Sequence, residues 1–367
     1  MEYHSADPIN NRSTYTELDN VTFNINNAGR KLVLGSVRLE GDLEVNNTGA
    51  TRSEITAANN QNGFNNRVGA GGMFDSFTTE AGNVGILENI SSDYGRYVNL
   101  VSSATETEDE LNNASNVCEL KSTNMRISNM ISTGNKQNNA TRTDMDFSVK
   151  PMICLNRNVE GGTLSFRKAG FMKLSLNLSR NYEFLNSLST TANYVISNLR
   201  LVYRTLEDDG SDESVQLRTI LSIKSTIQSN FANVSSNVPA VCSAVSVCFM
   251  RSNRENNQVY DNYNLERLEG FKSIQYLFNS SNNQYVSYII DTREEMLEKA
   301  IESLADTGHS SVNGKTVRGN SCEFAGLSFD APVDLSNQRF NIQIKDDNIV
   351  ANGGLNVYQF FHSAIDL

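Results

Sequence analysis

The sequence predicts an all-β protein built from two tandem antiparallel β-sandwiches, with a few short helices. Apolar residues recur at every second position in many short segments, which is the period of a half-buried strand. Only 38% of the residues are hydrophobic and 20% are charged. Asn, Ser and Thr fill the difference, and they favour turns and exposed strand faces. Helical segments do not alternate with strands as they do in a parallel α/β sheet.

The length of the chain indicates more than one domain. Its 367 residues exceed the size at which a single hydrophobic core usually stops growing. Residues 1–18 carry no apolar pattern, and we expect them to form an N-terminal arm that orders only against a partner. Strand patterns then begin at residues 21–25 and 37–45. We place the first sandwich in residues 19–206.

An acidic run separates the two halves. We interpret residues 207–214 as a linker, because the run lacks the spacing and the terminal bidentate Glu of an EF-hand calcium loop. The second sandwich is expected in residues 215–367. Its apolar run at 240–250 is nearly continuous, which predicts a strand buried on both faces. Cys242 and Cys248 are six residues apart in that run, so both should point to one core-facing side.

One helix stands out, at residues 291–305. Asp291 can cap its N-terminus, and Glu294 follows three residues later, close to a capping box. Gly308 supplies a stop signal. The helix has a single apolar stripe, made of Met296, Leu297, Ala300, Ile301 and Leu304.

Four long polar stretches interrupt the strands, at residues 46–75, 102–145, 251–265 and 305–321. Loops of this length are uncommon in compact domains unless they serve a function. The first contains the glycine-rich run Gly69–Gly72, which lacks the Lys-Ser/Thr of a phosphate-binding loop. We therefore interpret that run as a flexible turn.

The search for catalytic residues finds no motif. The three histidines, His4, His309 and His362, are expected at surface or terminal positions, each without a recognisable nucleophile beside it. Residues 319–323 begin like a nucleophile elbow but lack its second glycine. The five cysteines lack the CxxC spacing of a zinc site and are expected as free, mostly buried thiols. No catalytic, cofactor-binding or metal site is predicted, and no cofactor.

Charge and hydropathy argue against two kinds of partner. The net charge is −11, and no stretch clusters Lys and Arg as a phosphate-tracking groove requires. Direct nucleic-acid binding and docking on an anionic membrane are therefore not expected. The N-terminus has neither the basic head nor the apolar segment of a signal peptide. No apolar run approaches the roughly 20 residues of a membrane helix.

Several segments together resemble one family. The segment AGFMKLSLNLSRNYEFLNSLSTTANYVISNLRLVYRTL at residues 169–206 looks like the close of a first jelly roll. Residues 237–249, residues 328–345 and the ending NVYQFFHSAIDL are similar to second-roll segments, and GSVRLEGDLEV and ILENISSDYGRYVNL to the opening of the first roll. The pattern resembles the double jelly-roll major capsid proteins of icosahedral DNA viruses. This lineage includes adenovirus hexons, tectivirus-like phages and virophage or polinton-type capsids.

The resemblance implies a structural, non-enzymatic role. Such subunits form homotrimers whose six jelly rolls give a pseudo-hexagonal capsomer, which contacts neighbouring capsomers and penton and minor capsid proteins. The shell often stands above an internal membrane, which it reaches through membrane proteins. The expected location is the virion, after synthesis in the host cytoplasm. The four polar stretches would then face outward or contact other subunits, and the arm and the C-terminal tail would lie at the inner rim.

Two other functions stay open at this stage. A penton or minor capsid protein would have one jelly roll and a distal receptor-binding domain, and would assemble with different symmetry. A carbohydrate-binding or glycosidase β-sandwich would need a carboxylate pair, which proximity in the fold alone could supply. The chain contains no tryptophan, the residue that sugar-binding sites often use as a platform, and this weakens the second alternative.

Overall fold

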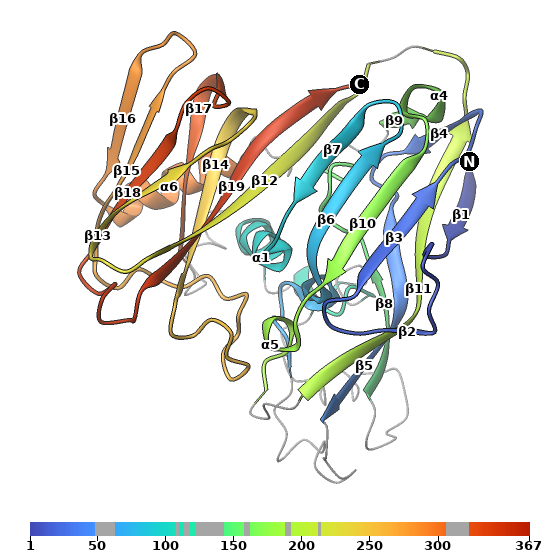
Figure 1. Ribbon diagram of the computed structural model, residues 1–367, viewed down its shortest axis with the longest axis horizontal. Helices are drawn as coiled ribbons and strands as arrows, with labels where there is room; N and C mark the ends of the chain where they lie inside the picture. Colours follow the sequence, from blue (N-terminus) through green and yellow to red (C-terminus); the bar gives the residue numbers. More distant parts are fainter. Residues whose placement is uncertain are drawn as a thin grey trace.

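The computed structural model describes residues 1–47, 63–107, 110–113, 118–121, 143–157, 162–187, 192–211, 214–305 and 323–367. Within these ranges the strands form three sheets, arranged as two sandwiches side by side along the long axis of the molecule (Figure 1). The predicted all-β class with two antiparallel sandwiches is confirmed. No helix in the described ranges is long and apolar enough to cross a membrane.

The first sandwich encloses the larger core. One of its sheets has seven described strands. Apolar side chains that face the core, such as those of Leu39, Leu43 and Val45, alternate with outward polar ones. The order is β8 (Thr143–Val149), β5 (Arg38–Asn47), β11 (Ala192–Glu207), β4 (Arg30–Val33) and β9 (Thr163–Ser165), with β1 (Glu2–Ala6) and β2 (Thr14–Tyr15) paired to β11. The facing strands are β3 (Asn20–Ile25), β10 (Met172–Leu178), β6 (Phe74–Ala81) and β7 (Gly85–Ile90).

The second sandwich repeats this arrangement with a separate core. Its outer sheet consists of β13 (Phe231–Ser236), β18 (Phe340–Asp346), β15 (Phe271–Asn279) and β16 (Tyr285–Ile290). Facing it are β17 (Phe324–Asp334), β14 (Val241–Arg251), β19 (Leu355–Asp366) and β12 (Gln216–Ile227). Aromatic side chains fill the space between the sheets, among them Phe278, Phe329 and Phe340.

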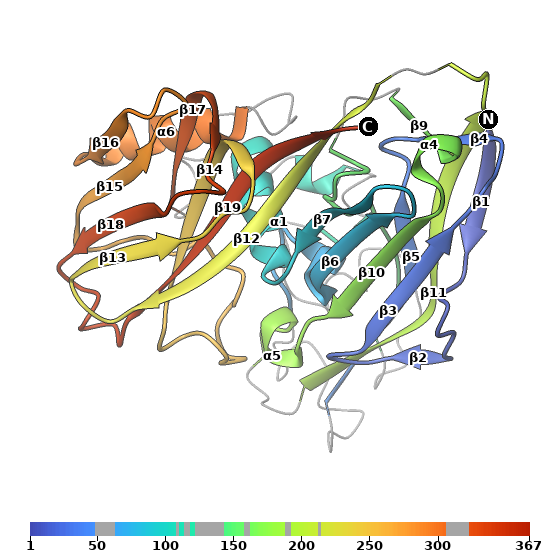
Figure 2. The ribbon, with the colours of Figure 1, turned by 45° about the horizontal axis from the view of Figure 1, so that its top comes forward.

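One sheet runs through both sandwiches. Among the described strands its order is β17-β14-β19-β12-β7-β6-β10-β3, so β7 of the first sandwich and β12 of the second are neighbours (Figure 2). They pair in parallel where Asn89 lies opposite Leu221. Beside this pairing, the hydroxyl of Ser91 lies 3.3 Å from that of Ser222. The two halves are therefore joined through backbone as well as side chains.

Two helices cover the outside of the second sandwich and create a third core. Helix α1 (Tyr94–Thr105) and helix α6 (Arg293–Ala305) pack on the face of the β17–β12 strands that points away from the second core. The strands beneath them are therefore apolar on both faces, as the continuous run in β14 predicted. The shorter helices are α4 (Phe166–Ala169), α5 (Asn181–Phe184) and the 3₁₀ helices η2 (Gly69–Met73) and η3 (Glu110–Asn112).

The N-terminal segment is ordered by pairing with its own chain. Strand β1 pairs with residues 201–205 of β11, and β2 pairs with Ile196 and Ser197 of the same strand. The prediction that residues 1–18 order only against another molecule is wrong. The backbone of this polar segment finds its hydrogen bonds on a strand of its own chain, which an apolar periodicity cannot reveal.

The helix at residues 291–305 is confirmed, with a different cap. Thr292, not Asp291, precedes the first helical residue, and its hydroxyl accepts the backbone N–H of Glu295 at 3.3 Å. The predicted stop residue Gly308 lies outside the described residues. Helix α1 was not predicted from the sequence; the residue before it, its N-cap Asp93, adopts a positive φ of 61°.

The two strand cysteines point in opposite directions. Cys242 lies in the core between the sheets, whereas Cys248 lies in the core beneath the helices. The pairing register of β14 shifts between Cys242 and Ala244, which marks a β-bulge. A bulge adds one residue and reverses the alternation beyond it. The prediction that both face one side is therefore wrong, although both are buried.

Candidate functional site

Among the described residues, several buried polar contacts lie at the junction of the two sandwiches. Tyr263, from the loop after β14, inserts its ring into the core of the first sandwich. Its hydroxyl donates to the carbonyl of Gly72 at 2.7 Å and lies 3.0 Å from the Ser179 hydroxyl. Asn99 of α1 donates to the Tyr263 carbonyl at 2.6 Å.

Glycines make room for this ring. A Cβ on Gly72 would lie 2.8 Å from the Tyr263 ring, and one on Gly95 would lie 2.6 Å from it. The glycine-rich run therefore is not the flexible turn that we predicted but the buried helix η2. Most of residues 63–75, expected as the end of a surface excursion, are buried. Part of the 251–265 stretch likewise contacts its own chain.

A buried ion pair lies at the same junction. Glu88 of β7 and Arg157 are both almost fully inaccessible to solvent and are bonded to each other. Glu88 also accepts the backbone N–H groups of Cys154 at 2.7 Å and Ile220 at 2.8 Å. Arg157 donates to the Arg218 carbonyl at 3.1 Å. Because Ile220 and Arg218 belong to β12, the pair connects the two sandwiches, and its bonds offset the cost of burying two charges.

Three half-buried carboxylates lie near these contacts. Asp75 accepts the backbone N–H of Asp93 at 3.0 Å, and the Asp93 carboxylate lies 3.5 Å from the Arg96 guanidinium. The pKa of Glu183 in α5 is raised to about 7, mainly by burial and also by the charges of Asp75 and Asp93. Burial is also the main cause that raises the pKa of Asp75. The junction therefore contains carboxyl groups that take up protons more readily than ordinary ones.

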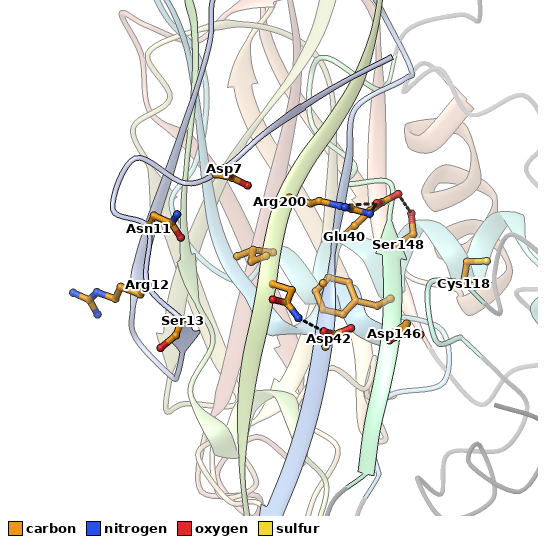
Figure 3. A pocket seen from close by; sticks show the side chains of 14 residues that line it. Asp7, Asn11, Arg12, Ser13, Glu40, Asp42, Cys118, Asp146, Ser148 and Arg200 are labelled. Carbon is orange, nitrogen blue, oxygen red and sulfur yellow. Dashed lines mark hydrogen bonds and ion pairs between the residues drawn. The ribbon is translucent and has the colours of Figure 1, made fainter. Parts of the chain in front are cut away.

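A groove opens on the outer face of β5, β8 and β11 (Figure 3). Its volume is about 970 Å³. Arg200 donates to Glu40 at 2.9 Å, Ser148 donates to the other oxygen of Glu40 at 3.3 Å, and Asn198 donates to Asp42. The carboxylates of Glu40 and Asp42 thus already have donors. The aromatic residue of its wall, Phe147, is buried and offers no platform to a sugar ring.

Comparisons with known proteins decide the fold family. No family model matches the sequence, and no curated protein gives a significant match. Solved structures do match. The Faustovirus major capsid protein aligns with 100% of this chain and 90% of its own, at a TM-score of 0.64 and 8% identity. PBCV-1 VP54, fitted into a reconstruction of the virophage Sputnik, aligns with 100% and 94% at 0.59 and 11%. The mavirus major capsid protein aligns with 99% and 86% at 0.52 and 9%.

The chain has the double jelly-roll fold of viral major capsid proteins. Both sandwiches of this chain are matched, since the alignments run its full length. At 8–11% identity the likeness lies in the fold, and a comparison of sequences alone finds no match.

The candidate residues from the sequence lie apart in this double jelly roll. His4 is half-buried on β1, with its ring stacked on Tyr203 at 5.3 Å. His362 is buried in β19, contrary to the predicted surface or terminal position. His309 and residues 319–322 lie outside the described residues. Within the described residues no three His, Cys, Asp or Glu side chains converge as metal ligands.

His362 contacts a serine side chain in the interior of the double jelly roll. Its Nε2 lies 2.9 Å from the Ser246 hydroxyl, which lies 3.0 Å from the Ser303 hydroxyl. Both serines are fully buried, Ser246 on β14 and Ser303 on the side of α6 that packs against it. A substrate cannot reach a nucleophile placed there, so the contact satisfies polar groups within the core.

The acidic linker run binds a lysine. Lys31 of β4 pairs with Asp209 and lies 3.9 Å from Asp208. These contacts hold the pKa of Asp209 below its usual range, with Lys31 as the main cause. The acidic run therefore forms an ion pair with Lys31 of the same chain, and this contact gives no reason to propose a calcium site.

Proposed function

We propose that this chain is a structural major capsid protein, which trimerises into pseudo-hexameric capsomers of an icosahedral shell. The observation that carries the proposal is the likeness to three major capsid proteins over the full length of the chain. The rigid junction supports it, because six rolls in a trimer keep a fixed geometry only if each pair of rolls is locked together.

The proposal divides the chain as the sequence suggested. The first jelly roll occupies residues 19–206, the linker 207–214 and the second roll 215–367, with residues 1–18 preceding them. The partners are copies of the chain, neighbouring capsomers, and penton and minor capsid proteins, and the location is the virion. We propose no enzymatic role and no direct nucleic-acid binding for the chain.

The presence of a second sandwich argues against the penton alternative, which calls for a distal domain of another fold. The groove on β5, β8 and β11 does not favour a glycan site, because its wall lacks an exposed aromatic ring.

Light scattering coupled to size-exclusion chromatography tests the proposal. We expect a trimer at micromolar concentration, with an interface of roughly 2,000 Å² or more, the scale of obligate oligomers. Electron micrographs of the purified protein should show particles with a pseudo-hexagonal outline. A monomeric chain, or a pentamer, would refute the proposal.

A further inference from the structure

Strand β16 forms an unusual sheet edge. It is the last strand in the order β13-β18-β15-β16, and among the described residues it pairs with β15 alone. Its six residues, Tyr285 to Ile290, include no charge and no proline. Edge strands of monomeric proteins are usually protected by charges, prolines or bulges. Strand β17, at the matching edge of the facing sheet, has such protection in Asp330 and Pro332.

Two of the three outward side chains of β16 are largely apolar. Tyr285 is 67% exposed and Ile289 is 55% exposed. Between them Ser287 bonds to Gln275 on β15. An uncharged, exposed and apolar edge of this kind is a site of association unless another surface covers it.

A cleft runs beside this edge. It has a volume of about 660 Å³ and lies between β16 and β17. Val286 and Tyr288 of β16 line one side, and Leu327 and Phe329 of β17 line the other. Phe329 belongs to the second core, where its ring packs 4.9 Å from that of Phe278. The sandwich is therefore incompletely closed at this edge, and apolar core residues form the floor of the cleft.

A second sheet edge, which has exposed apolar side chains beside the charged Glu2, lies at the opposite end of the molecule. In Figure 1, β16 and β1 occupy the two ends of the long axis. Tyr3 on β1 is 74% exposed, and Met1 and Ile9 are exposed beside it. Both surfaces also carry charges of each sign: Glu2 and Arg204, whose guanidinium lies 5.9 Å from the Tyr3 ring, at β1, and Asp330 and Lys299 at the cleft.

We infer that the β16 edge, with its cleft, is covered by the β1 edge of a second copy of this chain. A closed ring of identical subunits needs two different patches that complement each other, one at each end of the subunit. The β16 and β1 edges meet this need. They lie at opposite ends of the subunit, both expose apolar side chains, and both carry charges of each sign that can pair. The inference rests on the proposed function, since it names the surfaces that would join the trimer.

Single substitutions at the two edges test the inference. Ile289→Lys and Tyr3→Lys each place a charge in the contact, so each should leave a monomer in light scattering where the wild type is a trimer. Circular dichroism should be unchanged, because both side chains point outward. Val350→Lys is the matched control, since Val350 is also exposed and apolar but lies in the loop after β18.

Mixing the two variants tests the head-to-tail arrangement. Ile289→Lys retains an intact β1 edge and Tyr3→Lys an intact β16 edge, so an equimolar mixture should form a one-to-one dimer. Misfolded variants would not do this. A trimer that persists in either variant, or a mixture that stays monomeric, would overturn the inference and leave the capsid proposal standing. A monomeric wild type would refute the capsid proposal itself.

Discussion

The ring of Tyr263 occupies the space that a side chain at position 95 would need. The nearest ring carbons lie 2.6 Å from the place of a Cβ on Gly95. The loop of the second jelly roll and helix α1 are thus fitted to each other, and the fit depends on one residue having no side chain. This contact between Tyr263 and Gly95 fixes the two apolar cores relative to each other.

Substitution at this contact should reveal coupling. Tyr263→Ala removes a buried aromatic ring and should cost about 3–5 kcal/mol of unfolding free energy. Gly95→Ala should cost about 1–3 kcal/mol, because overpacking exceeds the gain of about 1 kcal/mol that Ala brings to a helix. In the Tyr263→Ala background, Gly95→Ala should instead stabilise the protein. Urea denaturation of the four proteins measures this cycle.

Tyr260→Ala is the control for that experiment. Tyr260 lies in the same loop but is 40% exposed, so its loss should change the unfolding free energy much less, by no more than about 0.5–1 kcal/mol. Additive effects of Gly95→Ala and Tyr263→Ala would contradict the close contact.

The buried pair of Glu88 and Arg157 should behave as a unit. Glu88→Ala or Arg157→Ala leaves an uncompensated buried charge and should cost about 3–5 kcal/mol. Replacement of both, as Glu88→Leu with Arg157→Met, should be less damaging than either single change. Thermal unfolding of the three variants checks this order. If the double variant were the least stable, the pair would owe its effect to its separate bonds to the backbone of β12.

Stability should depend on the protonation of Glu183. Burial raises its pKa from the ordinary 4.5 to about 7, so the folded state binds a proton more tightly than the unfolded state. The stabilisation is complete below pH 4.5 and is lost as the pH rises to about 7. Glu183→Gln should therefore raise the melting temperature at pH 8, with little change at pH 4. The exposed Glu294→Gln on α6 is the control, and an equal shift in both variants would exclude this cause.

The sequence predicted what depends on local periodicity. Alternation located most strands, and the stripe on residues 291–305 located α6, because both patterns arise from one buried face. Contacts between segments that are far apart in the sequence could not be predicted from local periodicity. The β-bulge that turns Cys248 away from Cys242 arises from strand pairing, and no local pattern records it.

The junction was missed for a similar reason. Glycines at positions 69–72 look the same in a flexible turn and beneath a packed tyrosine, and the difference lies in Tyr263, roughly 190 residues further along the chain. No local pattern marks Glu88 and Arg157 as buried. Their burial depends on three backbone segments that meet only in the folded chain. The glycine run combined with the two tyrosines of the 251–265 stretch, Tyr260 and Tyr263, was the available signal.

Thiol reactivity should separate the cysteines by environment. Cys118 is exposed on the wall of the groove, whereas Cys154, Cys242 and Cys248 are buried. Burial raises the pKa of Cys242 and Cys248 to about 12, which leaves little thiolate at neutral pH. A Cys322→Ser variant should therefore release one equivalent of thionitrobenzoate per chain at once, and the other three only on unfolding. Adding Cys118→Ser should abolish the rapid phase. Rapid reaction that survives in the double variant would show that one of the jelly-roll cores opens in the native protein.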